Sequence, residues 1–117
     1  MKQPKVWVIK EKKVIDVHAI DFVNKIIFQN TGGRTKKFYP FDEVEFMENT
    51  GYVDINKKHI CVGDIVEILG VYFEIKYRTF KGYVIENEEH ILSLEANLDS
   101  VSVVGNIYEN KELLKNE

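Results

Sequence analysis

Short runs rich in β-branched and aromatic residues, separated by charged or glycine-containing segments, dominate the first third of the chain. The runs occupy residues 6–9, 14–22, 26–29 and 36–39, and the separators are residues 10–13, Asn24-Lys25 and residues 30–33. β-Branched and aromatic residues favour strands, while glycine and asparagine favour the turns that join them. The alternation of apolar and polar residues slips near Ile20, which is typical of a β-bulge or a turn. This pattern predicts successive β-hairpins.

A short helix is predicted next, over residues 42–48. Asp42 is a suitable N-cap, and Glu43 and Glu45 follow near the positive end of the helix dipole. Residues 44, 46 and 47 give this segment a short apolar side, and Asn49-Thr50-Gly51 ends it. We therefore divide the chain near residue 50 into a β-rich N-terminal sub-domain, residues 1–50, and a C-terminal sub-domain, residues 51–117.

The second half of the chain predicts five short strands and a terminal helix. Residues 64–69 and 72–77 form a hairpin around Gly70-Val71, where the glycine suits a type II′ turn and Phe73, Ile75 and Tyr77 share one face. Further strands are predicted at residues 83–86, 90–94 and 101–104, and five close strands with tight turns are typical of a small barrel. Residues 107–115 have the pattern of a short amphipathic helix. The predicted fold class is mainly β with short helices, and no internal repeat stands out.

The composition is that of an ordinary globular domain, with 44% hydrophobic and 30% charged residues among 117. No apolar run approaches the roughly 18 residues that a membrane-spanning helix needs, and the first residues lack a signal-peptide pattern. We therefore expect no membrane association. The single cysteine, Cys61, lies between Ile60 and Val62, which predicts a buried thiol in a reducing compartment. This places the expected location in the cytoplasm.

The net charge of −3 hides an uneven distribution along the chain. Residues 1–40 hold 9 Lys/Arg and 3 Asp/Glu, whereas residues 41–117 hold 7 and 16, so the two parts carry +6 and −9. One interpretation is a basic surface that meets phosphate or an acidic partner; the other is complementarity between the halves, within one chain or between subunits. We favour the second, because lysine-rich outer strand faces commonly keep sheets soluble.

The sequence offers no pattern typical of an enzyme. His59-x-Cys61 is the only His/Cys pair close in sequence, and a closed zinc site would have to borrow His18 or His90. No serine lies in a nucleophile-elbow pattern, and the setting of Cys61 does not activate a thiolate. The prediction is therefore a non-enzymatic protein with no catalytic residues, no bound metal and no cofactor.

Two groups of side chains are candidates for interaction surfaces. The first is a basic hairpin tip beside Phe38, Tyr39 and Phe41 that could contact nucleic acid; its basic residues are Lys25, Arg34, Lys36 and Lys37. Its alternative interpretation, which we favour, is a solvated loop above core aromatics. The second group could face a protein partner and consists of Tyr72, Tyr77, Phe80 and Tyr83, of which at least half are expected in the core.

Two segments resemble a known family. Residues 41–66 contain a methionine-bearing predicted helical turn, the dipeptide Thr50-Gly51, an Asp54-x-Asn56 turn and the strand entry Gly63-Asp64-Ile65. Residues 104–114 contain Val-Gly-Asn-Ile-Tyr-Glu-Asn followed by Glu-Leu-Leu. Both segments are similar to the YopX family of phage and prophage proteins. The chain departs from the family pattern at Lys57, where a turn glycine is usual, at Asn49, near a position that is often aromatic, and at Lys111, where a proline commonly opens the last helix.

The resemblance implies a mostly β fold with an SH3-like barrel in residues 51–117, a phage or prophage gene, and no assigned catalytic residues. The family positions that it matches are expected to shape turns; together with the hairpin glycine they are Gly51, Gly63, Asp64, Gly70, Gly105 and Asn106. The leading hypothesis for function is a protein-interaction module, with a host or phage protein as partner, that also self-associates through edge strands such as residues 6–9. The alternatives are nucleic-acid binding through the basic hairpin and an oligomer that sequesters a small nucleotide signal.

Overall fold

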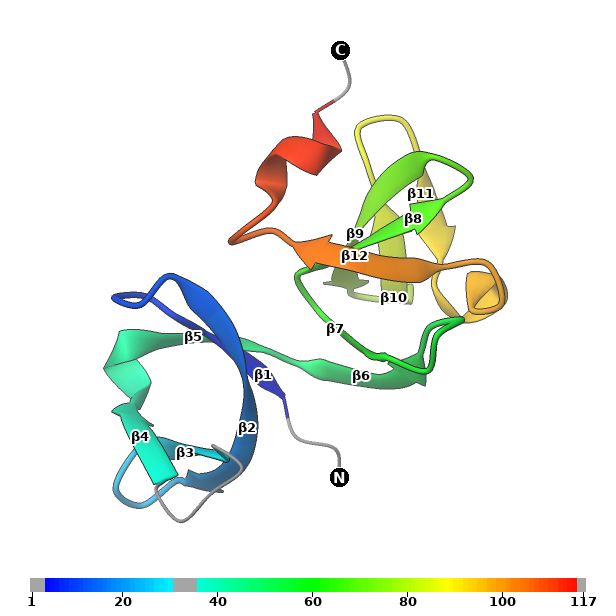
Figure 1. The fold of residues 1–117 in the computed structure, drawn as a ribbon. Coiled ribbons are helices and arrows are strands. Elements are labelled where there is room, and N and C mark those ends of the chain that lie inside the picture. Colours follow the sequence, from blue (N-terminus) through cyan, green and yellow to red (C-terminus); the bar gives the residue numbers. More distant parts are fainter. Residues whose placement is uncertain (1–3, 31–35, 116–117) are drawn as a thin grey trace. The chain divides into compact units, whose positions relative to one another are not determined.

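The computed structural model describes residues 4–30 and 36–115, and within these ranges the chain is mainly β (Figure 1). Its strands form three antiparallel sheets, and the helical segments of the described ranges are three short 3₁₀ turns. None of these segments is long and apolar enough to span a membrane. The chain divides into two compact units, Met1–Glu48 and Asn49–Glu117.

Unit 1 contains one five-stranded sheet in the order β4-β3-β2-β1-β5. Antiparallel pairing of β1 with β2 and of β3 with β4 confirms the predicted hairpins. The register between β2 and β3 shifts between Val17 and Ala19, close to the predicted slip. The elements of the unit are β1 (Lys5–Val8), β2 (Lys13–Asp21), β3 (Ile26–Asn30), β4 (Lys36–Pro40), the 3₁₀ turn η1 (Phe41–Glu43) and β5 (Val44–Met47).

The sheet of unit 1 is curled, as Figure 1 shows. Its two edge strands, β4 and β5, are joined only by the three residues of η1. Four residue steps span at most about 14 Å, whereas the edges of a flat five-stranded sheet lie about 19 Å apart. Backbone hydrogen bonds fix this connection, because Phe41 donates to the Lys25 carbonyl at 2.9 Å and Ile9 donates to the Glu43 carbonyl at 3.1 Å.

The inner side of this sheet carries the core of unit 1. Ile20 and Phe41 pack against the core from partly buried positions. Each fully buried Val or Ile stabilises the unit by roughly 1.5–3 kcal/mol. The buried members of the cluster are Val6, Val8, Ile15, Val17, Ile27, Tyr39 and Val44.

The prediction of a helix over residues 42–48 is wrong. Helical geometry is limited to Phe41–Glu43, and Val44–Met47 continues as β5, which pairs with β1 from Val8↔Val44 to Lys5↔Met47. The free edge of β1 offers a row of backbone partners, and this pairing outweighs the local helix signals of Asp42. The pairing also means that β1 lies between β2 and β5, so the expected edge strand at residues 6–9 is an inner strand.

Unit 2 contains a five-stranded sheet in the order β11-β10-β9-β8-β12 and a two-stranded sheet of β6 and β7. The strands β6 and β7 differ from the prediction, which places a helix end and a polar turn in this region. Thr50 helps to join them, since its hydroxyl donates to the Ile60 carbonyl at 2.8 Å. The elements are β6 (Asn49–Val53), β7 (His59–Cys61), β8 (Asp64–Ile68), β9 (Val71–Arg78), β10 (Gly82–Glu86), β11 (Ile91–Ser93), β12 (Ser102–Asn106) and the 3₁₀ turns η2 (Glu95–Asn97) and η3 (Lys111–Leu114).

The two five-stranded sheets share one topology. In each, the fifth strand pairs with the first, the other four follow in chain order, and a 3₁₀ turn precedes the fifth strand: η1 before β5 and η2 before β12. The sequence shows no corresponding repeat. Within residues 49–115 the hydrogen-bonded order runs from β11 to β12 without closure, so the SH3-like barrel stays a prediction.

The core of unit 2 lies on the face of β9 that the sequence predicts. Phe73 and Ile75 are buried there, whereas Tyr77, on the same face, is 59% exposed. Tyr52, Tyr83 and other partly buried side chains surround this core. Its buried members are Ile60, Val66, Phe73, Ile75, Ile85, Leu94 and Val101.

Two local predictions in unit 2 are wrong. The β8–β9 hairpin turns at Leu69-Gly70, because Ile68 pairs with Val71. Both turn residues have positive φ, 50° and 83°, which is a type I′ turn in place of the predicted type II′. The terminal helix predicted over residues 107–115 is replaced by a turn and the four-residue η3. There the Asn106 side chain accepts the N–H groups of residues 108 and 109, which holds the chain in a turn.

Buried polar side chains organise the loops of unit 2. Asp54 accepts three backbone N–H groups at 2.8 Å, those of Asn56 and Lys58 through Oδ1 and that of Val103 through Oδ2. The carboxylate thereby ties the turn after β6 to β12. Lys57, which stands where the family usually has glycine, has a φ of 63°. This left-handed conformation explains why glycine is common at that position.

Two Gly-Asx pairs belong to the segments that resemble the family. Gly63-Asp64 lies at a turn, and Gly105-Asn106 lies at a close packing contact. Gly63 has a φ of 98°, and Asp64 accepts the Cys61 N–H at 2.7 Å. Gly51 and Gly70 also have positive φ, whereas Gly105 does not. Gly105 instead packs against Asn110, whose Oδ1 would lie 2.5 Å from a Cβ placed at residue 105. Asn106, the residue that follows, is 9% exposed.

Candidate functional site

Among the basic residues of the predicted nucleic-acid surface that the structure describes, Lys25 lies apart from Lys36 and Lys37. Lys25 ends the β2–β3 turn beside Ile26, whereas Lys36 and Lys37 begin β4 at the opposite end of β3, where Lys36 pairs with Asn30. Ile26 and Asn30 are four residues apart, which is about 13 Å along a strand. Arg34 lies outside the described residues. The structure therefore separates Lys25 from Lys36 and Lys37, and nucleic-acid binding stays a prediction.

The three aromatic residues beside this basic segment occupy different environments. Tyr39 is buried in the core of unit 1, and Phe41 is partly buried against it. Phe38 is 61% exposed and lies on the outer side of the sheet, 6.4 Å from Phe28 between ring centroids. Only Phe38 of the three is open enough for a base to stack on it.

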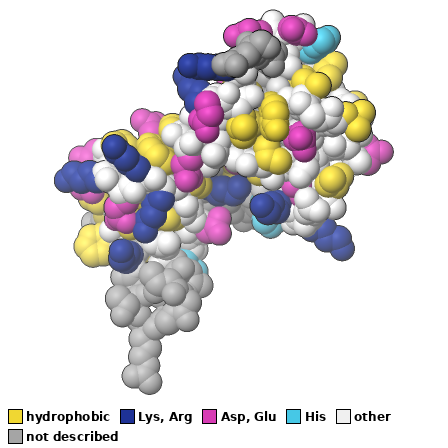
Figure 2. Space-filling model, turned by 45° about the horizontal axis from the view of Figure 1, so that its top comes forward, with side chains coloured by type: hydrophobic (Ala, Val, Ile, Leu, Met, Phe, Trp, Pro, Cys, Tyr) yellow, Lys and Arg dark blue, Asp and Glu magenta, His cyan; other side chains and the backbone are white. Residues whose placement is uncertain are grey.

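Unit 1 contains an aromatic row that the sequence pattern does not indicate. Phe41 contacts Phe22 edge to face at 6.1 Å and Phe46 at 5.3 Å between ring centroids. Phe22 and Phe46 are exposed by 73% and 42%. The helix predicted over residues 42–48 does not place Phe46 beside Phe41, whereas the strand β5 does. On the face seen in Figure 2, hydrophobic side chains lie in small groups among charged ones.

The structure brings together three of the four aromatic residues of the predicted partner surface. Tyr77 and Tyr83 pair across β9 and β10 with ring centroids 5.4 Å apart, and Phe80 lies in the turn that joins these strands. Tyr72 is separate, because it lies at the other end of β9 and on the opposite face. None of the four is fully buried, so the expectation that half are core residues is wrong. We call Tyr77, Phe80 and Tyr83 the hairpin-tip aromatics.

Phe80 combines full exposure with an unfavourable backbone. Its relative exposure is 102% and its φ is 72°, within the left-handed region that L-residues avoid. The turn is closed by the Lys81 N–H, which donates to the Arg78 carbonyl at 3.0 Å. Leu69, in the β8–β9 turn, shares both properties, with 98% exposure and a φ of 50°. The aromatic pair beside the turn is what distinguishes Phe80.

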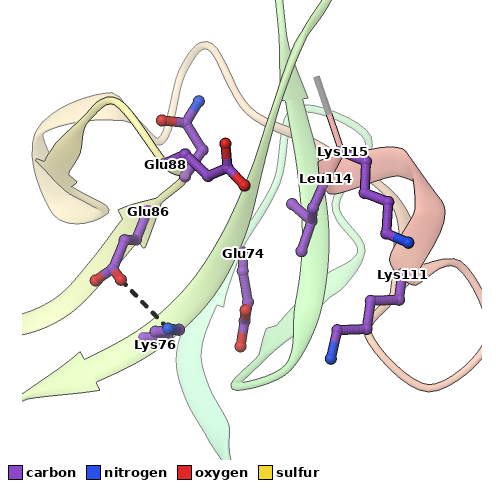
Figure 3. Close-up of a pocket in the computed structure, with 8 residues that line it drawn as sticks. Glu74, Lys76, Glu86, Glu88, Lys111, Leu114 and Lys115 are labelled. Carbon is purple, nitrogen blue, oxygen red and sulfur yellow. Dashed lines mark hydrogen bonds and ion pairs between the residues drawn. The ribbon is translucent and has the colours of Figure 1, made fainter. Parts of the chain in front are cut away.

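A charged cavity of about 330 Å³ lies on the other face of the β9–β10 hairpin (Figure 3). Glu74 and Lys76 from β9 and Glu86 from β10 form one wall, and Glu88 follows in the next loop. The opposite wall comes from the C-terminal segment that contains η3. No cofactor pattern in the sequence had pointed to this site.

Some of the charges at this cavity are paired. Glu86 accepts two hydrogen bonds from Arg78 Nη2 at 2.7 Å and one from Lys76 Nζ at 3.2 Å. The Arg78 guanidinium first, and Lys76 after it, hold the pKa of Glu86 below its usual range. Burial raises the pKa of Glu74, although Lys76 acts in the other direction. The wall of the cavity therefore has one hydrogen-bonded carboxylate, Glu86, and one, Glu74, whose charged form is disfavoured by burial.

The histidines and the cysteine are spread over the fold. His18, His59 and His90 are exposed, and the single cysteine of the chain, Cys61, is buried. Across residues 4–30 and 36–115, no three His, Cys, Asp or Glu side chains form a group suited to hold a metal ion.

The comparisons with known proteins agree with the resemblance carried by residues 41–66 and 104–114. The crystal structure of protein EF1440 from Enterococcus faecalis matches with a TM-score of 0.66 and 23% sequence identity, over 98% of this chain and 99% of that chain. At this identity the match shows a shared fold and nothing more. A search of the curated proteins gives no match. The model of the family described as YopX protein covers residues 4–115, and the chain therefore belongs to the YopX family.

Proposed function

We propose that this protein is a non-enzymatic interaction module that binds a protein partner through the hairpin-tip aromatics. The observation that carries the proposal is Phe80, which is fully exposed in a left-handed backbone beside the Tyr77–Tyr83 pair. A left-handed conformation costs an L-residue roughly 1–2 kcal/mol. Large aromatic side chains supply much of the binding energy at protein interfaces. A solvated turn would be better served by glycine at this position.

The charges beside the turn indicate the chemistry of the partner. Lys81 is exposed within the turn, and Arg78 lies at its start. A matching segment would present an apolar side chain next to carboxylates, because the aromatics would bury the first and Lys81 would attract the second.

The test uses two matched glycine variants of the full chain. Phe80→Gly and Leu69→Gly each remove a fully exposed hydrophobic side chain from a positive-φ position. Each should stabilise unit 2 by roughly 0.5–1 kcal/mol, since the relieved strain exceeds the added flexibility of the unfolded chain. Only Phe80→Gly should weaken partner binding.

The partner would be found by affinity capture from a bacterial host lysate at high salt after nuclease treatment, and then purified for calorimetry. Loss of its affinity with Phe80→Gly and retention with Leu69→Gly would support the proposal. Equal affinity for wild type and both variants would refute it. Recovery of nucleic acid that disappears at high salt would instead favour binding through Lys36 and Lys37.

The remaining parts of the proposal rest on the family and the sequence. A phage or prophage gene fits the YopX family, and the cytoplasm fits the single buried cysteine. Self-association would use the edge strands of the two large sheets, which are β4 and β5 in unit 1 and β11 and β12 in unit 2. The molar mass in solution tests this part independently of partner binding.

A further inference from the structure

The charged cavity of unit 2 has the size of a small-molecule site. Its volume of about 330 Å³ lies at the lower end of ligand pockets, which begin near 300 Å³. Figure 3 shows Glu74 between the Lys76–Glu86 pair on one side and Leu114 and Lys111 on the other. Glu74 and Lys76 occupy the face of β9 opposite to Ile75 and Tyr77, so this site is separate from the hairpin-tip aromatics.

Four charged groups at the cavity form no direct pair in the described part of the chain, although Lys111 acts electrostatically on Glu74. Within the described ranges, Glu74, Glu88, Lys111 and Lys115 make no hydrogen bond or ion pair through their side chains. They are charges of both signs around one small space. A simple anion would satisfy the two lysines and leave the carboxylates unpaired, and a simple cation would do the reverse. A molecule that carries both charges satisfies all four.

We propose that this cavity binds a small zwitterion. Its ammonium or guanidinium group would pair with Glu74 and Glu88, and its carboxylate would pair with Lys111 and Lys115. Leu114 lies between the two lysines in sequence and lines the cavity, where it offers an apolar contact to the alkyl part of the ligand. The volume admits a ligand of the size of an amino acid or the end of a peptide chain.

The environment of Glu74 provides a second reason and a second readout. Burial raises the pKa of this carboxyl group because its charged form is poorly solvated. A cationic group bound beside it would stabilise the charged form. Ligand binding should therefore lower the pKa of Glu74, which a carboxyl-carbon NMR titration measures directly.

The ligand can be a free amino acid or a chain end, and the probes separate these sources. Calorimetry with the full chain would compare L-arginine and L-lysine with their Nα-acetyl forms, which keep the side-chain cation and the carboxylate of a C-terminal residue. Binding by the free amino acids alone identifies a free zwitterion, and binding by the acetylated forms as well identifies a chain end. The amides of both amino acids lack the carboxylate and acetyl-norleucine lacks the cation, so these probes should bind more weakly.

The variants Glu74→Gln and Lys111→Gln each remove one sign of charge, while Lys58→Gln removes an exposed lysine that does not line the cavity. Affinity should fall about tenfold or more with each of the first two, which corresponds to roughly 1.4 kcal/mol, and remain unchanged with the third. Circular dichroism would check that every variant is folded. The proposal is overturned if no zwitterion binds at millimolar concentration, or if the amides or acetyl-norleucine bind as well as the zwitterions.

Discussion

Replacing Gly105 with alanine should destabilise unit 2 by about 2–4 kcal/mol. A Cβ at this position would lie 2.5 Å from Asn110 Oδ1, 2.7 Å from its Cγ and 2.9 Å from its Cβ. Rotation of the Asn110 side chain can move the first two atoms away. The Asn110 Cβ is fixed to the backbone, so the chain itself must shift.

The expected magnitude has two parts. Asn110 Oδ1 accepts the Asn106 N–H at 3.2 Å, and moving that oxygen loses a hydrogen bond worth about 1 kcal/mol. The displacement of the backbone is an overpacking effect of about 1–3 kcal/mol. The conformation of residue 105 adds nothing, because its φ is not positive.

Urea denaturation followed by circular dichroism would measure the loss of stability. Trp7, the only tryptophan of the chain, lies in β1 and reports on unit 1 by its fluorescence. Amide hydrogen exchange of the β8–β12 ladder reports on unit 2. The exchange in that ladder should accelerate in the Gly105→Ala variant.

A double-mutant cycle tests the assigned cause. Asn110→Gly removes all three contacting atoms, so Gly105→Ala in that background should cost less than about 1 kcal/mol. A loss below about 0.5 kcal/mol in the wild-type background would refute the reasoning, as would equal losses in both backgrounds.

The remaining predictions concern a turn and an ion pair. Lys57→Gly should stabilise unit 2 by roughly 0.5–1 kcal/mol, because Lys57 has a φ of 63° and glycine adopts this conformation freely; a decrease in the urea midpoint would contradict this. The pair of Glu86 with Arg78 should contribute about 1 kcal/mol at neutral pH. Because the folded-state pKa of Glu86 is lowered, this contribution is present above the ordinary value of 4.5 and is lost as the pH falls through the lower folded value. The stability difference between wild type and Glu86→Gln should therefore shrink in acid, and a difference that grows below pH 4.5 would exclude this origin.

The sequence predicts the strands whose own residues alternate and misses those that depend on distant partners. The hairpins of β1–β2 and β8–β9 carry their pattern locally. In contrast, β5 becomes a strand because the edge of β1 is open to it, and β6 and β7 are held together by contacts such as Thr50 to Ile60. The conformational preferences of the individual residues do not predict these strand pairings.

The candidate sites show the same division. Residue parity already separates Tyr72 from Tyr77, because side chains an odd number of positions apart in a strand point to opposite faces. The sequence could therefore have divided that group. The charged cavity could not be predicted from the sequence. One of its walls comes from β9 and β10, and the other comes from the segment containing η3, for which the sequence predicts a helix.

The shared topology of the two large sheets also creates a folding problem. Each sheet leaves a place beside its first strand for a fifth strand, and β5 and β12 are short enough to compete for either place during folding. Such strand exchange is a typical kinetic trap of chains that repeat one architecture. A side chain of β12 distinguishes the two strands: Asn106 accepts the N–H groups of residues 108 and 109 and so holds the turn that follows β12. The four residues of β5 include no asparagine, so β5 could not form this turn in the place of β12.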